Sequence, residues 1–241
     1  MPSSQHDNRV TALKPIPSVE ETLRSRVQRE LRCAILDGRY VAGQKLVERE
    51  LCEQTGASRS ILREALAGLE VSGLVECESY RGYRVTLLSA RKVREIFELR
   101  SSLETQAAEL FAERASESEL SELQALLLSL EHCVASGDLA SMRKLKEDYY
   151  ELLFSGCRNE EVRRALSNVI DRIHYLRGRL MSDPKRREVS LAEMRRLTAA
   201  LVARDRLAAR AACLAHLAAA RDTLLDSMAL ESGISDSKAM P

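Results

Sequence analysis

Hydrophobic positions in the first third of the chain recur mostly with the spacing of amphipathic helices. Between Leu23 and Leu36 they lie three and four residues apart, which predicts a helix that Ser18 caps and that ends at a glycine. Two shorter apolar stripes follow at 48–55 and 59–72, with a tight glycine turn between them. This spacing predicts two short helices joined by a turn.

The spacing then changes from helical to alternating. Residues 74–78 and 83–87 carry apolar side chains at about every second position, on either side of the tripeptide 80–82. Alternation around a turn that contains glycine predicts a β-hairpin. The segment before Leu88 is therefore expected to contain a helix, a helix-turn-helix and a hairpin, with a short extended stretch at 45–47.

Helical spacing returns at Ser89 and continues to about Leu230. Helices are expected over 90–115, 118–136, 138–156, 160–181, 187–203 and 205–229. Because short polar breaks join them, they are expected to form an antiparallel bundle. The predicted fold is mainly α: an N-terminal winged helix-turn-helix with a small β-hairpin, followed by an all-α antiparallel helical bundle. The expected organisation is a flexible arm at 1–17, a winged domain at 18–88, a helical domain at 89–230 and a flexible tail at 231–241.

Composition agrees with a helical protein, because aromatic residues make up only 4% while good helix formers dominate. The formal net charge of +1 neither favours nor excludes nucleic acid, so any DNA-binding surface depends on local charge. No segment approaches the ~18 consecutive apolar residues of a membrane helix. The six cysteines are scattered without a Cys-x-x-Cys pair. We therefore expect a protein of a reducing cytoplasm, without a membrane partner or a disulfide framework.

The segment 48–74 has the layout of a DNA-binding helix-turn-helix. A tight turn at Gly56 separates two short helices, and polar side chains stand at the start of the second. Arg59 and Arg63 are one helical turn apart and share a face, and a guanidinium suits both guanine edges and phosphate. The alternative is a solvated face on which these arginines pair with Glu64 and neighbouring carboxylates. Turn, cap, spacing and hairpin together favour DNA contact.

At these residues the chain resembles the GntR family of bacterial transcription regulators. The resemblance covers about residues 18–88 and is most specific over 47–51 and over 58–66, which reads Ser-Arg-Ser-Ile-Leu-Arg-Glu-Ala-Leu. It implies a winged helix-turn-helix that binds double-stranded DNA, in a bacterial cytoplasmic protein associated with the nucleoid. The contacts it implies come from Arg49, Ser58, Arg59, Ser60 and Arg63, with Arg81 and Gly82 on the wing.

The helical half resembles the FCD-type C-terminal domain of the FadR subfamily, through residues such as 96–104. Many members hold a divalent metal there with one aspartate and three histidines. The resemblance places Lys146 at the aspartate and Tyr150 and Met194 at two histidines, so that only His216 remains. Lysine is a cation and methionine is a poor ligand for hard ions, so we predict no metal and no other cofactor.

A pocket is nevertheless expected at this place. Lys146 is expected to pair with a carboxylate of the ligand, and Arg100, His174 and Arg177 on neighbouring helices are candidate anchors for an anion. The alternatives are interhelical salt bridges for the arginines and a hydrogen-bonded core position for the last histidine. The candidate effector residues are Arg100, Lys146, Tyr150, His174, Arg177, Met194 and His216.

These features predict a sequence-specific repressor that binds a palindromic operator as a homodimer and is released by a small effector of organic-acid type. A hinge is expected near 88–90. One alternative is a ligand-independent or activating regulator with a degenerate pocket. An enzyme would need a converging nucleophile, base or metal ligands, which the sequence does not show. An interaction adaptor without DNA binding would have lost the arginines of the recognition helix, which are present.

Overall fold

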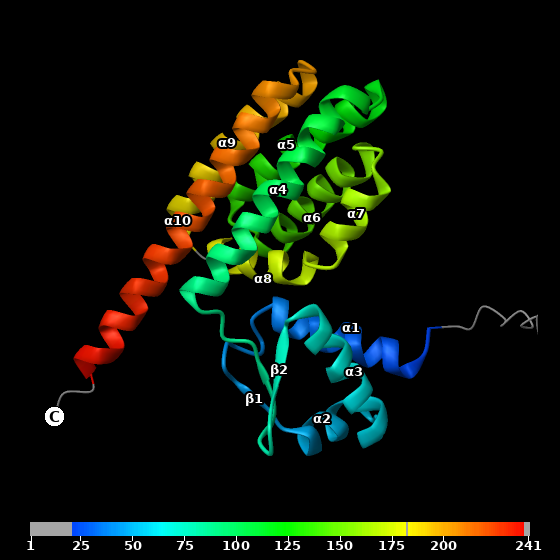
Figure 1. Cartoon of the computed structure of the whole chain (residues 1–241), viewed down its shortest axis with the longest axis vertical. Coiled ribbons are helices and arrows are strands. Elements are labelled where there is room, and N and C mark those ends of the chain that lie inside the picture. Colours follow the sequence, from blue (N-terminus) through cyan, green and yellow to red (C-terminus); the bar gives the residue numbers. More distant parts are fainter. Residues whose placement is uncertain (1–20, 182, 239–241) are drawn as a thin grey trace, which may run out of the picture.

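The computed structural model describes residues 21–181 and 183–238, with side chains described as far as residue 230. Figure 1 shows two parts, a small winged domain and a larger helical domain above it. The arm predicted at 1–17, and Ser18, lie outside the described residues.

The winged domain contains three helices and a three-stranded antiparallel sheet. Its elements are α1 (Leu23–Leu36), β1 (Lys45–Leu46), α2 (Glu48–Thr55), α3 (Arg59–Ser72), β2 (Val75–Glu78) and β3 (Gly82–Val85). The strands lie in the order β1-β3-β2, so the predicted hairpin is completed by the short extended stretch before α2. The first helix starts later than expected, because the side chain of Thr22, not Ser18, accepts a hydrogen bond from the Ser25 amide.

One apolar face of α3 fixes how the helix sits. Leu62, Leu66 and Leu69 are fully buried, and they pack with α1 and the sheet into the core of the winged domain. Gly56 ends α2 in a left-handed conformation with φ of 66°, which lets the chain turn tightly into α3. Because one face of α3 is held in the core, the opposite face at its N-terminus points to solvent.

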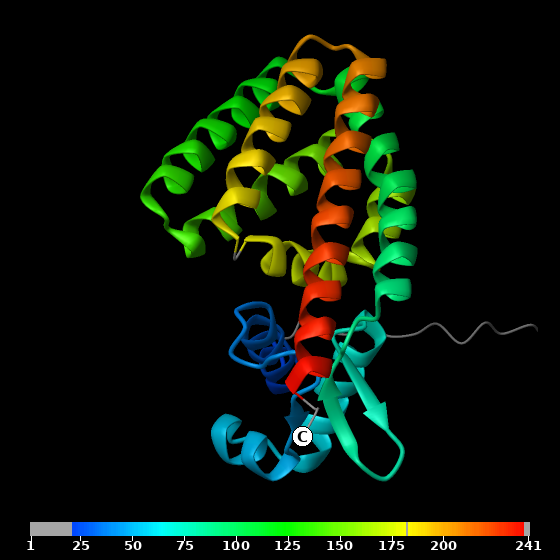
Figure 2. The same cartoon turned by 90° about the vertical axis from the view of Figure 1, so that its left-hand side faces the viewer.

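The helical domain contains the remaining helices of the described chain. They are α4 (Ala90–Arg114), α5 (Glu117–Ser136), α6 (Leu139–Gly156), α7 (Glu160–Ser167), α8 (Ile170–Met181), α9 (Pro184–Val202) and α10 (Arg206–Lys238). Figure 2 shows α4 and α10 side by side, with α10 running beyond the bundle. The core includes Phe97, Phe111 and Leu217, all nearly inaccessible to solvent.

In the helical domain, three boundaries differ from the sequence-based expectations by more than two residues. The helix predicted over 160–181 is broken at 168–169, where Asn168 ends α7. The α9 helix begins at Pro184, whose fixed φ suits a first helical position, and Asp183 caps it. The prediction of a loose tail is wrong for 231–238, because a helix that is already formed extends through polar residues at little cost. Residues 239–241 lie outside the described chain.

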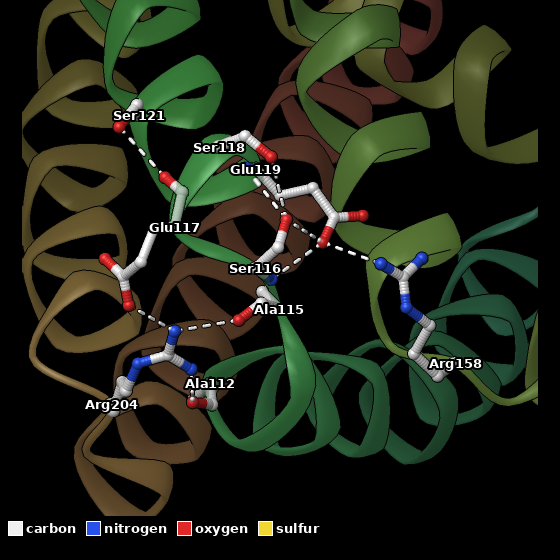
Figure 3. A network of polar contacts seen from close by, with 9 residues as sticks. All are labelled: Ala112, Ala115, Ser116, Glu117, Ser118, Glu119, Ser121, Arg158 and Arg204. Atoms are coloured by element: carbon white, nitrogen blue, oxygen red, sulfur yellow. Dashed lines mark hydrogen bonds and ion pairs between the residues drawn. The ribbon is translucent and has the colours of Figure 1, made fainter.

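A polar network closes the end of the helical domain that lies away from the winged domain (Figure 3). Ser116 and Glu119 form a capping box at the start of α5, and Arg158 donates to the same glutamate at 2.9 Å. Arg204 donates to the Ala115 carbonyl at 2.8 Å, which ties the loop before α10 to the end of α4.

Candidate DNA interface and buried effector site

The exposed N-terminus of α3 presents the residues that the sequence singled out. Ser58 caps the helix, because its hydroxyl accepts from the Ile61 amide at 3.4 Å. Ser60, Arg59 and Arg63 are all exposed. Arg59 has no hydrogen-bond or ion-pair partner among the described residues, so its donors are available to a ligand.

Arg63 is paired with a neighbouring carboxylate, which is Glu48 and not Glu64. Its Nε donates to both carboxylate oxygens of Glu48 on α2, at 3.1 and 3.0 Å, whereas Glu64 accepts from Ser60 at 3.5 Å. The Arg63 side chain is 67% exposed. Exposed pairs contribute only ~0–1 kcal/mol, so exchanging Glu48 for a phosphate or a base edge costs Arg63 little.

The wing presents one exposed cation at its tip. Arg81 is exposed and has no side-chain partner among the described residues, and Gly82 has φ of 83°, a conformation that glycine tolerates. Arg84 is neutralised within the sheet by Glu76 and Glu78, at 2.5 and 2.6 Å. Arg81 is therefore the wing residue that is placed to meet a phosphate.

Arg49 is exposed on α2, the first helix of the helix-turn-helix, and directly follows Glu48. It too has no hydrogen-bond or ion-pair partner in the part of the chain that the structure describes. The predicted DNA contacts are thus solvent-accessible, with a half-buried glycine at the wing. None of their guanidiniums is buried in the interior.

A small cavity lies inside the helical domain. Its volume is about 20 Å³, room for about one water-sized group. Five of the candidate effector residues line it: Arg100, Lys146, Tyr150, Arg177 and His216. The other two do not. Met194 is fully buried among apolar side chains, and His174 faces the winged domain, with Nδ1 3.3 Å from the Arg32 guanidinium.

One side of the cavity is a buried charge cluster built on Glu104. Arg100 donates to this carboxylate from Nε at 2.6 Å, and Arg177 lies 3.5 Å from its other oxygen. Arg100 and Glu104 are each only 1% exposed. Burial alone raises the pKa of Glu104, but the two guanidiniums outweigh it and hold the pKa below its usual value. The Arg177 guanidinium also stacks on Tyr150, 3.4 Å from the ring centroid.

The other side is built on Glu193, which sequence reasoning missed. Its Oε2 accepts from Arg186 at 2.8 Å and lies 2.6 Å from His216 Nδ1. The second ring nitrogen of His216 lies 3.0 Å from the Tyr150 hydroxyl. Glu193 directly precedes Met194 on α9, so the helix turns the carboxylate toward the cluster and the thioether into the core.

Lys146 adds a further cationic side chain to the lining of the cavity. Its Nζ donates to Ser190 at 3.0 Å and has no carboxylate partner among the described residues. Burial, followed by the charges of Arg177 and Arg186, lowers the pKa of Lys146 to about 7, although Glu193 opposes the shift.

Several buried donors at the cavity have no partner within the described chain. They are Nη1 of Arg100, Nη1 of Arg177, and Nε and Nη1 of Arg186. A buried donor without a partner costs ~1–3 kcal/mol, and more when it is charged. The cations around the cavity also outnumber Glu104 and Glu193. An anion with several acceptor oxygens would satisfy these donors and balance this charge.

The same residues do not fit a divalent metal. Both nitrogens of His216 already have partners, and the surrounding guanidiniums and the lysine would repel a cation. Within the described residues, no group of three His, Cys, Asp or Glu side chains lies close enough to hold a metal ion. The site therefore differs from the metal centre that the family resemblance implied for other members.

The fold and its exposed arginines define a DNA-binding transcription regulator with a separate helical domain. Residues 23–85 match the model of bacterial regulatory proteins of the gntR family, and residues 95–219 match the FCD domain. The chain therefore belongs to the GntR family of transcription regulators, with a C-terminal FCD domain. It is a regulator and not an enzyme.

Named relatives agree with this assignment. The chain is 32% identical to the HTH-type transcriptional regulator YdhC of Bacillus subtilis, over 78% of this chain and 84% of that protein. It is 30% identical to the Nta operon transcriptional regulator of Aminobacter aminovorans, over 76% and 86%. The structure of E. coli McbR/YncC matches with a TM-score of 0.72 at 23% identity, over 86% of this chain and 98% of that one. That likeness shows the shared fold.

No helix in the described part of the chain combines the length and the apolar character needed to span a bilayer.

Proposed function

We propose that this regulator is a repressor that binds a palindromic operator as a homodimer and is released by a small organic acid. The proposal of an acidic effector rests on the buried guanidinium donors around the cavity, which lack protein acceptors within the described chain. The observation that carries the DNA part is the exposed, capped start of α3. The two sites lie in different domains, as the control of one by the other requires.

In this proposal, α3 enters the major groove with Arg59 and Arg63 toward the bases, and the wing holds the backbone through Arg81. Arg59→Ala and Arg63→Ala are each expected to cost ~1–3 kcal/mol of specific binding. Fluorescence anisotropy with DNA from the region upstream of the gene measures this loss. Arg164→Ala, an exposed arginine on α7, is the matched control. Unchanged affinity in both test variants would contradict the proposed DNA contacts.

A homodimer through the helical domain is supported by the adjacent helices α4 and α10. They expose Leu99, Leu207 and Leu214, and the last two are seven residues apart and share a face of α10. A second copy that covers these side chains would bring two α3 helices to one operator. Sedimentation of Leu214→Glu tests this arrangement, with a shift from dimer to monomer as the expected result. A monomeric wild-type chain would contradict it.

The effector is proposed to place a carboxylate among Arg100, Arg177 and Arg186. The cavity admits only a compact group, so the anionic end of the acid is expected to enter first. A ligand that binds only the native state raises the melting temperature. Acetate, succinate and citrate are the probes, chloride is the salt control, and Arg186→Met is expected to abolish the stabilisation. If none of the acids stabilises the wild-type chain, the ligand-independent alternative holds.

A further inference from the structure

Ion pairs between described residues join the winged domain to the helical domain. Arg32 on α1 donates from Nε to Asp171 on α8 at 2.5 Å. Arg143 on α6 pairs with Asp37 and also donates to the Leu36 carbonyl at 3.0 Å. We name the Arg32–Asp171 and Arg143–Asp37 pairs the interdomain latch. All four side chains are partly exposed, between 14% and 49%, so neither pair is costly to break.

The helices that carry the latch also carry the cavity. On α6, Arg143 of the latch lies one turn before Lys146 of the cavity. On α8, Asp171 of the latch lies near the N-terminal end and Arg177 of the cavity lies farther along. A rigid shift of either helix therefore moves both sites together.

His174 strengthens this connection on the latch side. Its Nδ1 lies 3.3 Å from Arg32 and 3.3 Å from Glu147, the residue next to Lys146. Burial, followed by the charges of Arg177 and Arg32, lowers the pKa of His174 to about 3, so the ring is neutral and accepts from the guanidinium. The position that was expected to anchor an effector thus belongs to the contact between domains.

The α8 helix borders an open groove between the two domains. It is separate from α7, and it lies between the bundle and α1 (Figure 1). A groove of about 580 Å³ lies between the two domains beside the latch, and Tyr175 and Gly178 of α8 line it. Tyr175 packs against both hydrophobic cores, so the apolar contact across the interface is concentrated on the same helix.

We infer that an anion in the cavity opens the interdomain latch. An anion held by Arg177, Lys146 and Arg186 draws α8 and α6 toward the cavity, on the side away from α1. The Arg32–Asp171 pair then lengthens, and the winged domain gains freedom about the linker before α4. This inference rests on the proposed effector site, and it names the contacts by which occupancy of that site reaches the DNA-binding domain.

The test places a carboxylate in the cavity without an added ligand. Ser190 lines the cavity and accepts from Lys146, so Ser190→Asp supplies a tethered anion and Ser190→Asn is its neutral, similarly sized control. Asp171→Asn breaks the latch directly and gives the reference for an open interface. Amide hydrogen exchange in the full chain is followed over 30–38 and 168–181, and thermal unfolding is recorded for each variant.

The expected result is that Ser190→Asp exchanges faster than Ser190→Asn in both segments, on the order of fivefold and in the pattern of Asp171→Asn. Ser190→Asp is also expected to melt no lower than Ser190→Asn. If it melts no lower but its exchange is unchanged or slower, the latch inference is overturned while the anion site stands. If it melts well below the control, the cavity does not accept an anion, and the effector site and the latch inference both fail.

Discussion

The winged domain and the helical domain each gather arginines, but they place them in opposite environments. Arg59 and Arg81 are exposed, with no side-chain partner among the described residues. Arg100, Arg177 and Arg186 are buried around a small cavity, and each is less than one-tenth exposed. An exposed cation is cheap to hold and meets a large polyanion by diffusion. A buried cation is costly to hold, so it requires carboxylates in the fold or an anion that arrives later.

Burial, more than residue type, separates the two kinds of arginine site. Glu104 and Glu193 balance only part of the buried charge, and the remaining donors are those that the proposed anion would satisfy. At the exposed start of α3, the nearest counter-charge to Arg63 is Glu48, and Arg63 can exchange this partner at low cost. The predictions below test this contrast, in decreasing order of effect.

The largest effect is expected from removing the carboxylate at the centre of the buried cluster. Glu104→Ala leaves Arg100 and Arg177 without their common counter-charge in the interior. Breaking such a cluster is expected to cost ~3–5 kcal/mol in the free energy of unfolding. Urea denaturation measures this cost, with Glu160→Ala on exposed α7 as the control. A loss no greater than that of the control would mean that the buried charges do not depend on Glu104.

The next effect concerns the pH dependence of stability that Lys146 imposes. Its folded pKa of about 7 lies below the unfolded value of ~10.4, so the folded state loses this proton first. The free energy of unfolding therefore gains a contribution that rises with pH from about 7 toward ~10, on the order of 2 kcal/mol for this half-buried group. Lys146→Met removes that contribution.

The comparison with Lys146→Met removes the titration of the lysine together with its effect on His216, whose pKa the Lys146 charge lowers. The variant is expected to be more stable than the wild type near pH 6, with the advantage shrinking toward pH 10. Parallel stability curves across this range would show that Lys146 keeps an ordinary pKa.

On the exposed side, removing the Arg81 cation of the wing is expected to weaken DNA binding regardless of the DNA sequence. Arg81→Ala should weaken operator and random DNA by similar factors, on the order of fivefold, and lower the salt slope by about 1. Anisotropy titrations at several salt concentrations measure both quantities. A loss confined to the operator would instead assign Arg81 to base recognition.

The smallest effect is expected far from both sites. Ser116→Ala removes the cap of α5 and should cost ~1 kcal/mol in the free energy of unfolding. DNA affinity is expected to stay unchanged, which makes this variant a reference for destabilisation alone. A change in operator binding would show that the far end of the bundle communicates with the winged domain.

The two regions also differ in how far the sequence predicts them. The bounds of α2 and the cap and end of α3 follow from local signals, namely Ser58, Gly56 and Gly73, and the structure places them as expected. The alternative reading named Glu64 and neighbouring carboxylates as partners of Arg63, and the partner is Glu48, which lies on the preceding helix and reaches α3 only through packing. Local spacing therefore predicts elements and exposed faces better than it predicts ion pairs.

The cavity depends on helix packing between distant segments. Arg186 and Glu193 approach His216 only when α9 and α10 pack, and no local pattern in the sequence identifies them. Met194 was placed by the family resemblance and His174 by its position on a neighbouring helix, but the packing of α9 into the core and of α8 against α1 directs them elsewhere. Residues that share a site through tertiary contact were thus found only in part.

The central claim is that the exposed arginines of α3 read DNA. Its most direct test is the dissociation constant for DNA from the upstream region, compared between the wild-type chain and the Arg59→Ala/Arg63→Ala double variant. The account predicts a loss of at least about a hundredfold in specific affinity, with folding and oligomeric state unchanged. Wild-type affinity in the double variant would contradict it.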